Sequence, residues 1–185
     1  MAGGNNERSL IVLIGLMGSG KTSVGRALAK KLRVKFMDSD DLVESTAKLS
    51  VREIFLQNGE QDFRRRESLE LSCACATKES TVLAVAGGAI LAEENRDMLK
   101  KNATCVVWLD APTGILVERT GRAKHRPLLD ADPTGALTKM RDDRESLYRE
   151  LATHKVATQK MSVAHVVAEI ITVCDLRKTQ GVNSR

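Results

Sequence analysis

The segment Gly15-Leu16-Met17-Gly18-Ser19-Gly20-Lys21-Thr22 combines residue types and spacing that suit phosphate binding. It matches the pattern GxxxxGK[ST], in which glycines let backbone N–H groups curl around an anion. The Lys21 amine can reach the β and γ phosphates of a nucleoside triphosphate, and the Thr22 hydroxyl can ligate Mg²⁺. The loop therefore predicts a nucleoside triphosphate with Mg²⁺. The binding residues expected are Gly15, Gly18, Ser19, Gly20, Lys21, Thr22 and Ser23.

The nucleotide is expected to be ATP rather than GTP. Asp132-Pro133-Thr134-Gly135 matches the DxxG pattern of GTPases, but no apolar strand leads into it, and the chain has no NKxD motif. We interpret the DxxG match as part of a loop.

Two carboxylates, Asp38 and Asp40, follow an apolar run at 34–37. If this stretch is extended, side chains two residues apart face the same side. One carboxylate could then hold Mg²⁺, usually through water, while the other accepts hydrogen bonds from a substrate hydroxyl. The alternative is a helix N-cap or a solvated turn, because apolar residues follow directly.

Three consecutive arginines, Arg64 to Arg66, lie in a helical pattern and therefore point about 100° apart. They cannot all face one ligand. A planar guanidinium suits a carboxylate, which it can bind through two parallel hydrogen bonds. Gly87 and Gly88 end another apolar run, where glycine lets backbone N–H groups approach a ligand closely.

The pattern between these residues alternates apolar runs with amphipathic stretches. Strands are predicted at 9–14, 34–37, 81–86, 104–109 and 155–158, and helices at 21–32, 51–57, 61–77, 93–101, 112–120, 136–152 and 163–174. Strands that alternate with helices indicate an α/β fold with a parallel sheet covered on both faces. Ligands bind such sheets beyond the carboxyl ends of the strands. Gly15, Asp38, Gly87 and Asp110 are therefore expected along one rim.

Length and composition narrow the class of protein. The 185 residues suggest a single domain, expected over 1–178 with loose tails at 1–8 and 179–185. A net charge of +5 indicates an anionic partner, but only 3% of residues are aromatic, which disfavours nucleic acid. No apolar run is long enough to span a membrane, so no membrane association is expected. The four cysteines lack zinc-site spacing and are interpreted as buried thiols of a cytoplasmic protein.

The ordered motifs of the chain resemble the shikimate kinase family. They are GLMGSGKTSVGRALAKKL, FMDSDDLVE, IFLQNGEQDFRRRE, AGGAI, ENRDML, RTGRAKHRPLL and RESLYRELA, and they span about residues 9–160. The resemblance implies a P-loop NTPase-type three-layer αβα sandwich with a five-stranded parallel sheet in the order 2-3-1-4-5. It also implies a core at 9–32 and 80–175, a helical substrate-binding segment at about 38–77 and a mobile lid at about 121–135.

The resemblance also implies roles for single residues. Asp38, with Thr22, would hold Mg²⁺, and Asp40 would bind the substrate hydroxyls and act as a candidate general base. Lys21, Asp40 and Arg126 of the lid would be catalytic, while Arg119, Arg126 and Thr158 would contact ATP. Shikimate would be bound by Asp40, Arg64, Gly87, Gly88 and Arg144.

Two departures from the family pattern leave alternatives open. Ala86 replaces the first of three glycines, and Ala157 stands where the family has aspartate. The predicted function is transfer of the γ-phosphate of ATP to the 3-hydroxyl of shikimate. The alternatives are another P-loop small-molecule kinase, such as a gluconate or nucleoside monophosphate kinase, or a non-catalytic relative. A monomer is expected.

Overall fold

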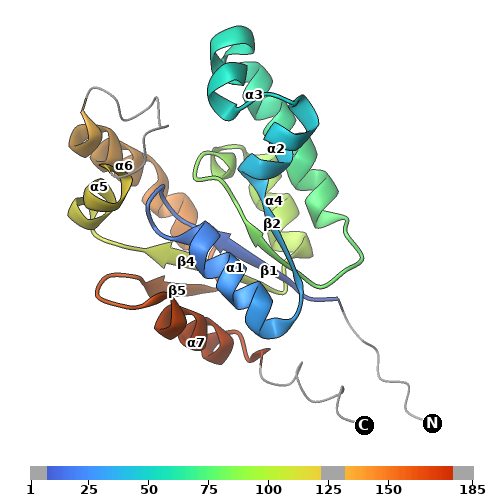
Figure 1. Ribbon diagram of the computed structural model, residues 1–185, viewed down its shortest axis with the longest axis vertical. Helices are drawn as coiled ribbons and strands as arrows, with labels where there is room; N and C mark the ends of the chain where they lie inside the picture. Colours follow the sequence, from blue (N-terminus) through green and yellow to red (C-terminus); the bar gives the residue numbers. More distant parts are fainter. Residues whose placement is uncertain (1–7, 122–131, 177–185) are drawn as a thin grey trace.

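The protein is described by a computed structural model over residues 8–121 and 132–176. Five parallel strands form one sheet in the order β2-β3-β1-β4-β5, as predicted (Figure 1). The strands are β1 (Leu10–Ile14), β2 (Lys35–Asp38), β3 (Thr81–Ala84), β4 (Cys105–Asp110) and β5 (His154–Ala157). Each of the five predicted strands is present, with ends that differ by at most two residues.

Helices cover both faces of the sheet, which confirms the three-layer αβα sandwich. They are α1 (Lys21–Leu32), α2 (Ser39–Ala47), α3 (Val51–Cys75), α4 (Glu93–Asn102), α5 (Thr113–Gly121), α6 (Pro133–Leu151) and α7 (Val163–Val173), with a short 3-10 turn, η1 (Ala89–Leu91). On one face α1 and α7 pack over the sheet, and on the other α3, α4, α5 and α6 do so.

The central strand β1 explains why both faces must be covered. Its five residues are all fully buried, with Leu10, Val12 and Ile14 on one face and Ile11 and Leu13 on the other. A strand with apolar side chains on both faces is stable only between two layers. The continuous apolar sequence therefore dictates the sandwich.

The segment after β2 contains one helix that the sequence analysis missed. Helix α2 begins directly after Asp38 and ends before Lys48. The next helix begins as predicted, with a capping box between Ser50 and Glu53. Gly59 interrupts α3 with φ of 80° and ψ of 172°, which confirms the predicted break. In Figure 1 α2 and the first half of α3 project beyond the sheet.

Most of the predicted lid at 121–135 lies between α5 and α6, but its first residue belongs to α5 and its last three to α6. Helix α5 ends at Gly121, and α6 begins at Pro133, three residues earlier than predicted. The early start has a local cause, because Asp132 caps the helix by accepting a hydrogen bond from the Gly135 N–H at 2.9 Å. The DxxG match is thus a helix start. Arg126 lies outside the described residues.

The interpretation of the cysteines was wrong in two respects. Cys105 and Cys174 form a disulfide, and Cys73 is exposed. Cys75 is a buried thiol, as expected. Spacing could not reveal the pair, because 69 residues separate its members.

Within residues 8–121 and 132–176, every helix is too short or too polar to cross a bilayer.

Candidate active site

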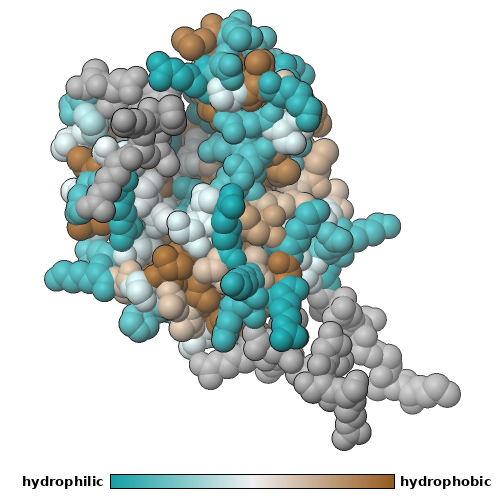
Figure 2. All heavy atoms as spheres, viewed as in Figure 1, coloured by the Kyte–Doolittle hydropathy of each residue, from teal (hydrophilic) through white to brown (hydrophobic). Residues whose placement is uncertain are grey.

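A cleft of about 770 Å³ lies beyond the carboxyl ends of the strands. This volume suits a small-molecule site. Figure 2 shows the surface hollowed between the α2–α3 side and the α5–α6 side, with mainly hydrophilic residues along α2. Fourteen of the predicted site residues line the cleft: Gly18, Ser19, Gly20, Lys21, Thr22, Ser23, Asp38, Asp40, Arg64, Gly87, Gly88, Arg119, Arg144 and Thr158.

One wall of the cleft is the predicted phosphate loop between β1 and α1. Gly20 is the N-cap of α1 with φ of 98°, a left-handed conformation that glycine adopts without strain. No side chain caps the first N–H groups of α1, and its first turn carries no acidic residue. The positive end of the helix therefore faces the cleft, which favours an anion there.

Lys21 lies against the loop that it follows. Its Nζ donates to the carbonyl oxygens of Gly15 at 2.8 Å and Leu16 at 3.1 Å. Gly15 is thus a contact of the lysine rather than a lining residue. Ser19 is buried, and its Oγ has no hydrogen-bond partner among the described residues. The loop thus gathers a cation and a buried hydroxyl at the cleft.

Asp38 and Asp40 both line the cleft, but not as alternate residues of a strand. Asp38 ends β2 and is the N-cap of α2, where its Oδ1 accepts from the Asp40 N–H at 3.2 Å. The predicted extended geometry was wrong, and the alternative of an N-cap was right for Asp38. Its second oxygen, Oδ2, accepts from the Thr22 hydroxyl at 2.8 Å. Asp38 therefore connects α2 to the phosphate loop.

The opposite wall carries Arg64 from α3. Its Nη1 donates to Glu67 Oε2 at 2.8 Å, and its Nη2 donates to Glu60 Oε1 at 3.1 Å. Although burial opposes the charged guanidinium, Glu67 and Glu60 raise the pKa of Arg64. Gly88 lies close against this side chain, since a Cβ at Gly88 would lie 2.5 Å from Nη1. Arg65 and Arg66 instead form ion pairs with Asp62.

Two side chains of α6 hold the Gly87 carbonyl oxygen. Arg144 Nη1 and the Tyr148 hydroxyl each donate to it at 3.1 Å. Tyr148 is buried and stacks on Trp108, with ring centroids 5.7 Å apart. Burial raises the pKa of Tyr148 to about 12, so its hydroxyl keeps its proton. The backbone after β3 is thereby fixed beside Arg144.

The backbone of Ala86 makes two hydrogen bonds. Its N–H donates to the buried hydroxyl of Ser39 at 2.8 Å, and its carbonyl oxygen accepts from the Ala89 N–H at 3.1 Å. Among the described residues, Ala86 is not one of the non-glycine positions with positive φ. An alanine therefore fits without backbone strain. Because Ser39 lies between Asp38 and Asp40, this contact holds the start of α2 against the backbone that follows β3.

Arg119 joins the phosphate loop to the segment after β5. Its Nη1 donates to the Gly18 carbonyl at 3.3 Å and to Thr158 Oγ1 at 3.1 Å, and its Nη2 donates to the Thr158 carbonyl at 2.8 Å. Thr158 also donates its hydroxyl to the Asp110 carbonyl at 3.2 Å. The two residues thus form a side of the cleft next to the phosphate loop.

Sequence reasoning missed several apolar lining residues. Phe55 and Phe63 lie 4.8 Å apart by ring centroid, and the Arg64 guanidinium lies 5.2 Å from the centre of the Phe63 ring. One signal was available, because two of the chain's three phenylalanines occur in the QDFRRRE region and just before it. Met161 and Val163, which also line the cleft, carried no such signal.

Glu67 is expected to make stability depend on pH. Its side chain is 1% exposed, and burial raises its pKa despite Arg64 nearby. A raised pKa means that the folded state binds the proton more tightly than the unfolded state does. The stability of the wild type relative to Glu67→Gln should therefore fall as pH rises from about 4.5, the ordinary value, through the raised pKa.

Urea unfolding of both proteins between about pH 4 and 8 measures this difference. Glu70→Gln, on the same helix, controls for replacing a carboxylate on α3. A difference that is constant, or that grows with pH, would contradict the raised pKa of Glu67.

Three comparisons with known proteins agree on one family. The family model for shikimate kinase matches residues 17–175. A shikimate kinase of Symbiobacterium thermophilum is 43% identical over 92% of this chain and 99% of its own length. The solved shikimate kinase of Acinetobacter baumannii in complex with shikimate is 36% identical with a TM-score of 0.87, covering 92% of this chain and 95% of that one.

A gluconokinase of Sinorhizobium meliloti also shares the fold, with a TM-score of 0.64 over 92% of this chain and 94% of that one. Its identity is only 23%, so this likeness concerns architecture alone. The family model and the high identity to shikimate kinases favour the first group over the gluconate-type alternative. This chain belongs to the shikimate kinase family, whose members are ATP-dependent kinases.

Proposed function

We propose that this protein transfers the γ-phosphoryl group of ATP to the 3-hydroxyl of shikimate. The observation that carries the proposal is a cleft lined by the phosphate loop on one side and by arginines and a carboxylate on the other. The Acinetobacter baumannii relative, solved in complex with shikimate, supports the choice of acceptor.

The donor side would bind ATP through the phosphate loop. The N–H groups from Gly15 to Ser23 surround the phosphates, and Lys21 turns from the carbonyls of Gly15 and Leu16 to the β and γ phosphates. Arg119 and Thr158 flank the base. We assign Arg126 the neutralisation of charge on the transferred group, as the resemblance implies.

The acceptor side would bind a small hydroxy-carboxylate. Arg64 and Arg144 offer guanidinium N–H groups from two helices, and the shikimate carboxylate can accept from both. The backbone at Gly87 and Gly88 allows close approach of the ring. Asp40 accepts a hydrogen bond from the 3-hydroxyl and orients it toward the phosphate loop.

A magnesium ion fits the oxygen donors between the two sides. The Thr22 hydroxyl and the Asp38 carboxylate, 2.8 Å apart, are the hard oxygen ligands that Mg²⁺ prefers. Thr22 would bind it directly and Asp38 directly or through water. Bound Mg²⁺ supplies neutralisation of phosphate charge.

The chemical step needs positioning and charge neutralisation more than covalent catalysis. The 3-hydroxyl oxygen attacks the γ phosphorus, the bond to the β–γ bridging oxygen breaks, and ADP leaves. The hydroxyl proton passes to Asp40 Oδ. Lys21 and Arg126 stabilise the charge that develops on the transferred group.

A steady-state assay with ATP tests the proposal directly. ADP release should require shikimate, and it should be absent with gluconate or a nucleoside monophosphate as the acceptor. Preference for gluconate would favour the alternative kinase. Tight ATP binding without turnover on shikimate would favour the non-catalytic alternative and overturn the proposal.

Gly88→Ala should weaken shikimate binding while sparing ATP. The new Cβ would displace the Arg64 guanidinium, which is held by Glu67 and Glu60. Loss of a charge-assisted hydrogen bond costs about 1.5–3 kcal/mol, so KM for shikimate should rise roughly 10- to 100-fold. KM for ATP should change little. Gly114→Ala, where a Cβ meets nothing within 4 Å, is the matched control. Equal KM values in Gly88→Ala and wild type would contradict this packing argument.

We also propose a cytoplasmic location, where ATP is supplied, and action as a monomer, because one chain contributes residues to all sides of the cleft.

A further inference from the structure

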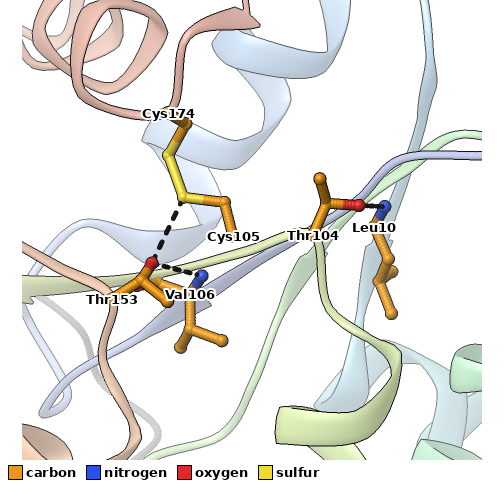
Figure 3. Close-up of a disulfide and its surroundings, with 6 residues drawn as sticks. All are labelled: Leu10, Thr104, Cys105, Val106, Thr153 and Cys174. Atoms are coloured by element: carbon orange, nitrogen blue, oxygen red, sulfur yellow. Dashed lines mark hydrogen bonds between the residues drawn. A yellow bond between two sulfur atoms is a disulfide. The ribbon is translucent and has the colours of Figure 1, made fainter.

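The disulfide between Cys105 and Cys174 joins the start of β4 to the end of α7 (Figure 3). The two Cα atoms lie 6.1 Å apart, within the range that native disulfides span. The backbone therefore places the two residues at a separation that a disulfide can span. This pair lies outside the cleft and has no part in the proposed phosphoryl transfer.

We propose that Cys105 and Cys174 are a reversible thiol–disulfide modification site that fastens α7 to the sheet. The accessible member is Cys174, which is half-buried, whereas Cys105 is 4% exposed. We therefore expect a reductant to attack at Cys174 rather than at Cys105. The reactants are a small dithiol for reduction and a small disulfide for oxidation.

The exchange proceeds through a mixed disulfide. A thiolate of the dithiol attacks Cys174 Sγ, the S–S bond breaks, and Cys105 leaves as a thiolate with the electron pair and takes up a proton. The second thiolate of the dithiol then attacks the first dithiol sulfur, which is bonded to Cys174 in the mixed disulfide. That bond breaks, and Cys174 is released as a thiolate that takes up a proton. Two electrons and two protons pass to the protein, and the dithiol becomes a cyclic disulfide.

Polar groups surround the leaving sulfur. Thr153 Oγ1 lies 3.5 Å from Cys105 Sγ and accepts from the Val106 N–H at 3.0 Å (Figure 3). The same hydroxyl donates to the Val106 carbonyl oxygen at 2.9 Å. A nitrogen of the His154 ring and both sulfurs lie within 4.8 Å of one another. Once in hydrogen-bond contact, an imidazole can give a proton to a thiolate or take one from a thiol. The reduced Cys105 thiol can donate to Thr153 Oγ1.

Helix α7 connects this site to the nucleotide side of the cleft. Val166 and Ile170 of α7 pack in the same apolar cluster as Val24 and Leu28 of α1, the helix that follows the phosphate loop. Val163 and Val166 also line the cleft. Reduction should loosen α7 and so lower the affinity for ATP more than that for shikimate. This consequence rests on the proposed function of the cleft, whereas the modification itself does not.

Counting thiols tests the modification independently of activity. The full chain has four cysteines, so alkylation of the denatured oxidised protein should label two thiols, and four after reduction. The oxidised protein should melt roughly 5–15 °C above the reduced one, as expected for one disulfide in a domain of this size. Reoxidation with a small disulfide should restore two thiols and the higher melting temperature.

Variants separate this pair from the other cysteines. Cys174→Ser should melt near the temperature of the reduced wild type and should not respond to reductant. Cys73→Ser, at an exposed free cysteine, should keep the full response. If Cys174→Ser does not fold, the thiol count and melting temperature of the wild type with and without reductant still test the proposal.

Three results would overturn the proposal. The first is four alkylated thiols in the oxidised protein, and the second is a melting temperature that reductant does not change. The third is one bound Zn²⁺ per chain with thiols that react only after chelation, since Cys105, His154 and Cys174 have spacing that suits a metal. Loss of kinase activity with an intact redox response would refute the proposed function alone.

Discussion

Lys21→Ala is expected to lower kcat by at least about 10²- to 10³-fold, because it removes a cation from the site where charge develops during transfer. Lys21 opens α1 and holds the carbonyls of Gly15 and Leu16, so the substitution removes a charge and two loop contacts together. ATP affinity should also fall. Steady-state rates at saturating shikimate and a direct measurement of ATP binding give the two effects separately.

Lys30→Ala is the matched control for this variant. Lys30 is exposed in the last turn of the same helix and does not line the cleft. Its kcat and melting temperature should stay close to those of the wild type. Wild-type turnover in Lys21→Ala would refute the role given to the phosphate loop.

Asp40→Asn is expected to lower kcat by roughly 10²- to 10⁴-fold, the usual contribution of a general base. The amide keeps the size of the side chain but cannot take up the hydroxyl proton. Asp40 lines the cleft from the first turn of α2, one residue beyond Ser39, which holds Ala86. ATP affinity should remain within a few-fold of the wild type, because Thr22 and Asp38 are unchanged.

Rates at saturating substrates and ATP binding by calorimetry distinguish these outcomes. Asp97→Asn, an exposed carboxylate on α4 away from the cleft lining, controls for a general effect of charge. A large loss of ATP affinity with little loss of kcat would assign Asp40 to the nucleotide rather than to the acceptor.

The disulfide experiment addresses a different property of the same chain. The phosphoryl-transfer variants alter residues that line the cleft, whereas Cys105 and Cys174 lie at the opposite ends of β4 and α7 from it. Additivity is expected between distant sites that share no partner. In the absence of ATP, the thiol count and the melting-temperature shift of Lys21→Ala on reduction should therefore equal those of the wild type.

Much of the fold could be predicted from local sequence. Helix α1 has the predicted bounds because its apolar residues recur at helical spacing and its phosphate loop fixes the start. The capping box at Ser50 and the break at Gly59 are equally local signals. Helix α2 was missed because it is short, and its cap, Asp38, also fits the end of a strand.

The site was only partly predictable, because local sequence patterns indicate which residues line a cleft but not which partners they contact. Residue type, motif spacing and the family resemblance together predicted fourteen of the lining residues, and the choice of Arg64 over Arg65 or Arg66 came from the resemblance. The partners of those residues could not be predicted. The hydroxyl of Tyr148 and the guanidinium of Arg144 meet the Gly87 carbonyl across about 60 residues of chain, and no local pattern encodes such a contact.

The sequence alone determined the phosphate loop from Gly15 to Thr22, since its chemistry depends on glycine, lysine and threonine at fixed spacing within one continuous segment. The tertiary structure decided what faces that loop. It brought Asp40, Arg64 and Gly88 to one cleft, and it joined Cys105 to Cys174 behind the sheet. These contacts join residues that are far apart in the sequence. They follow from strand order and helix packing, and they form only when the whole chain is folded.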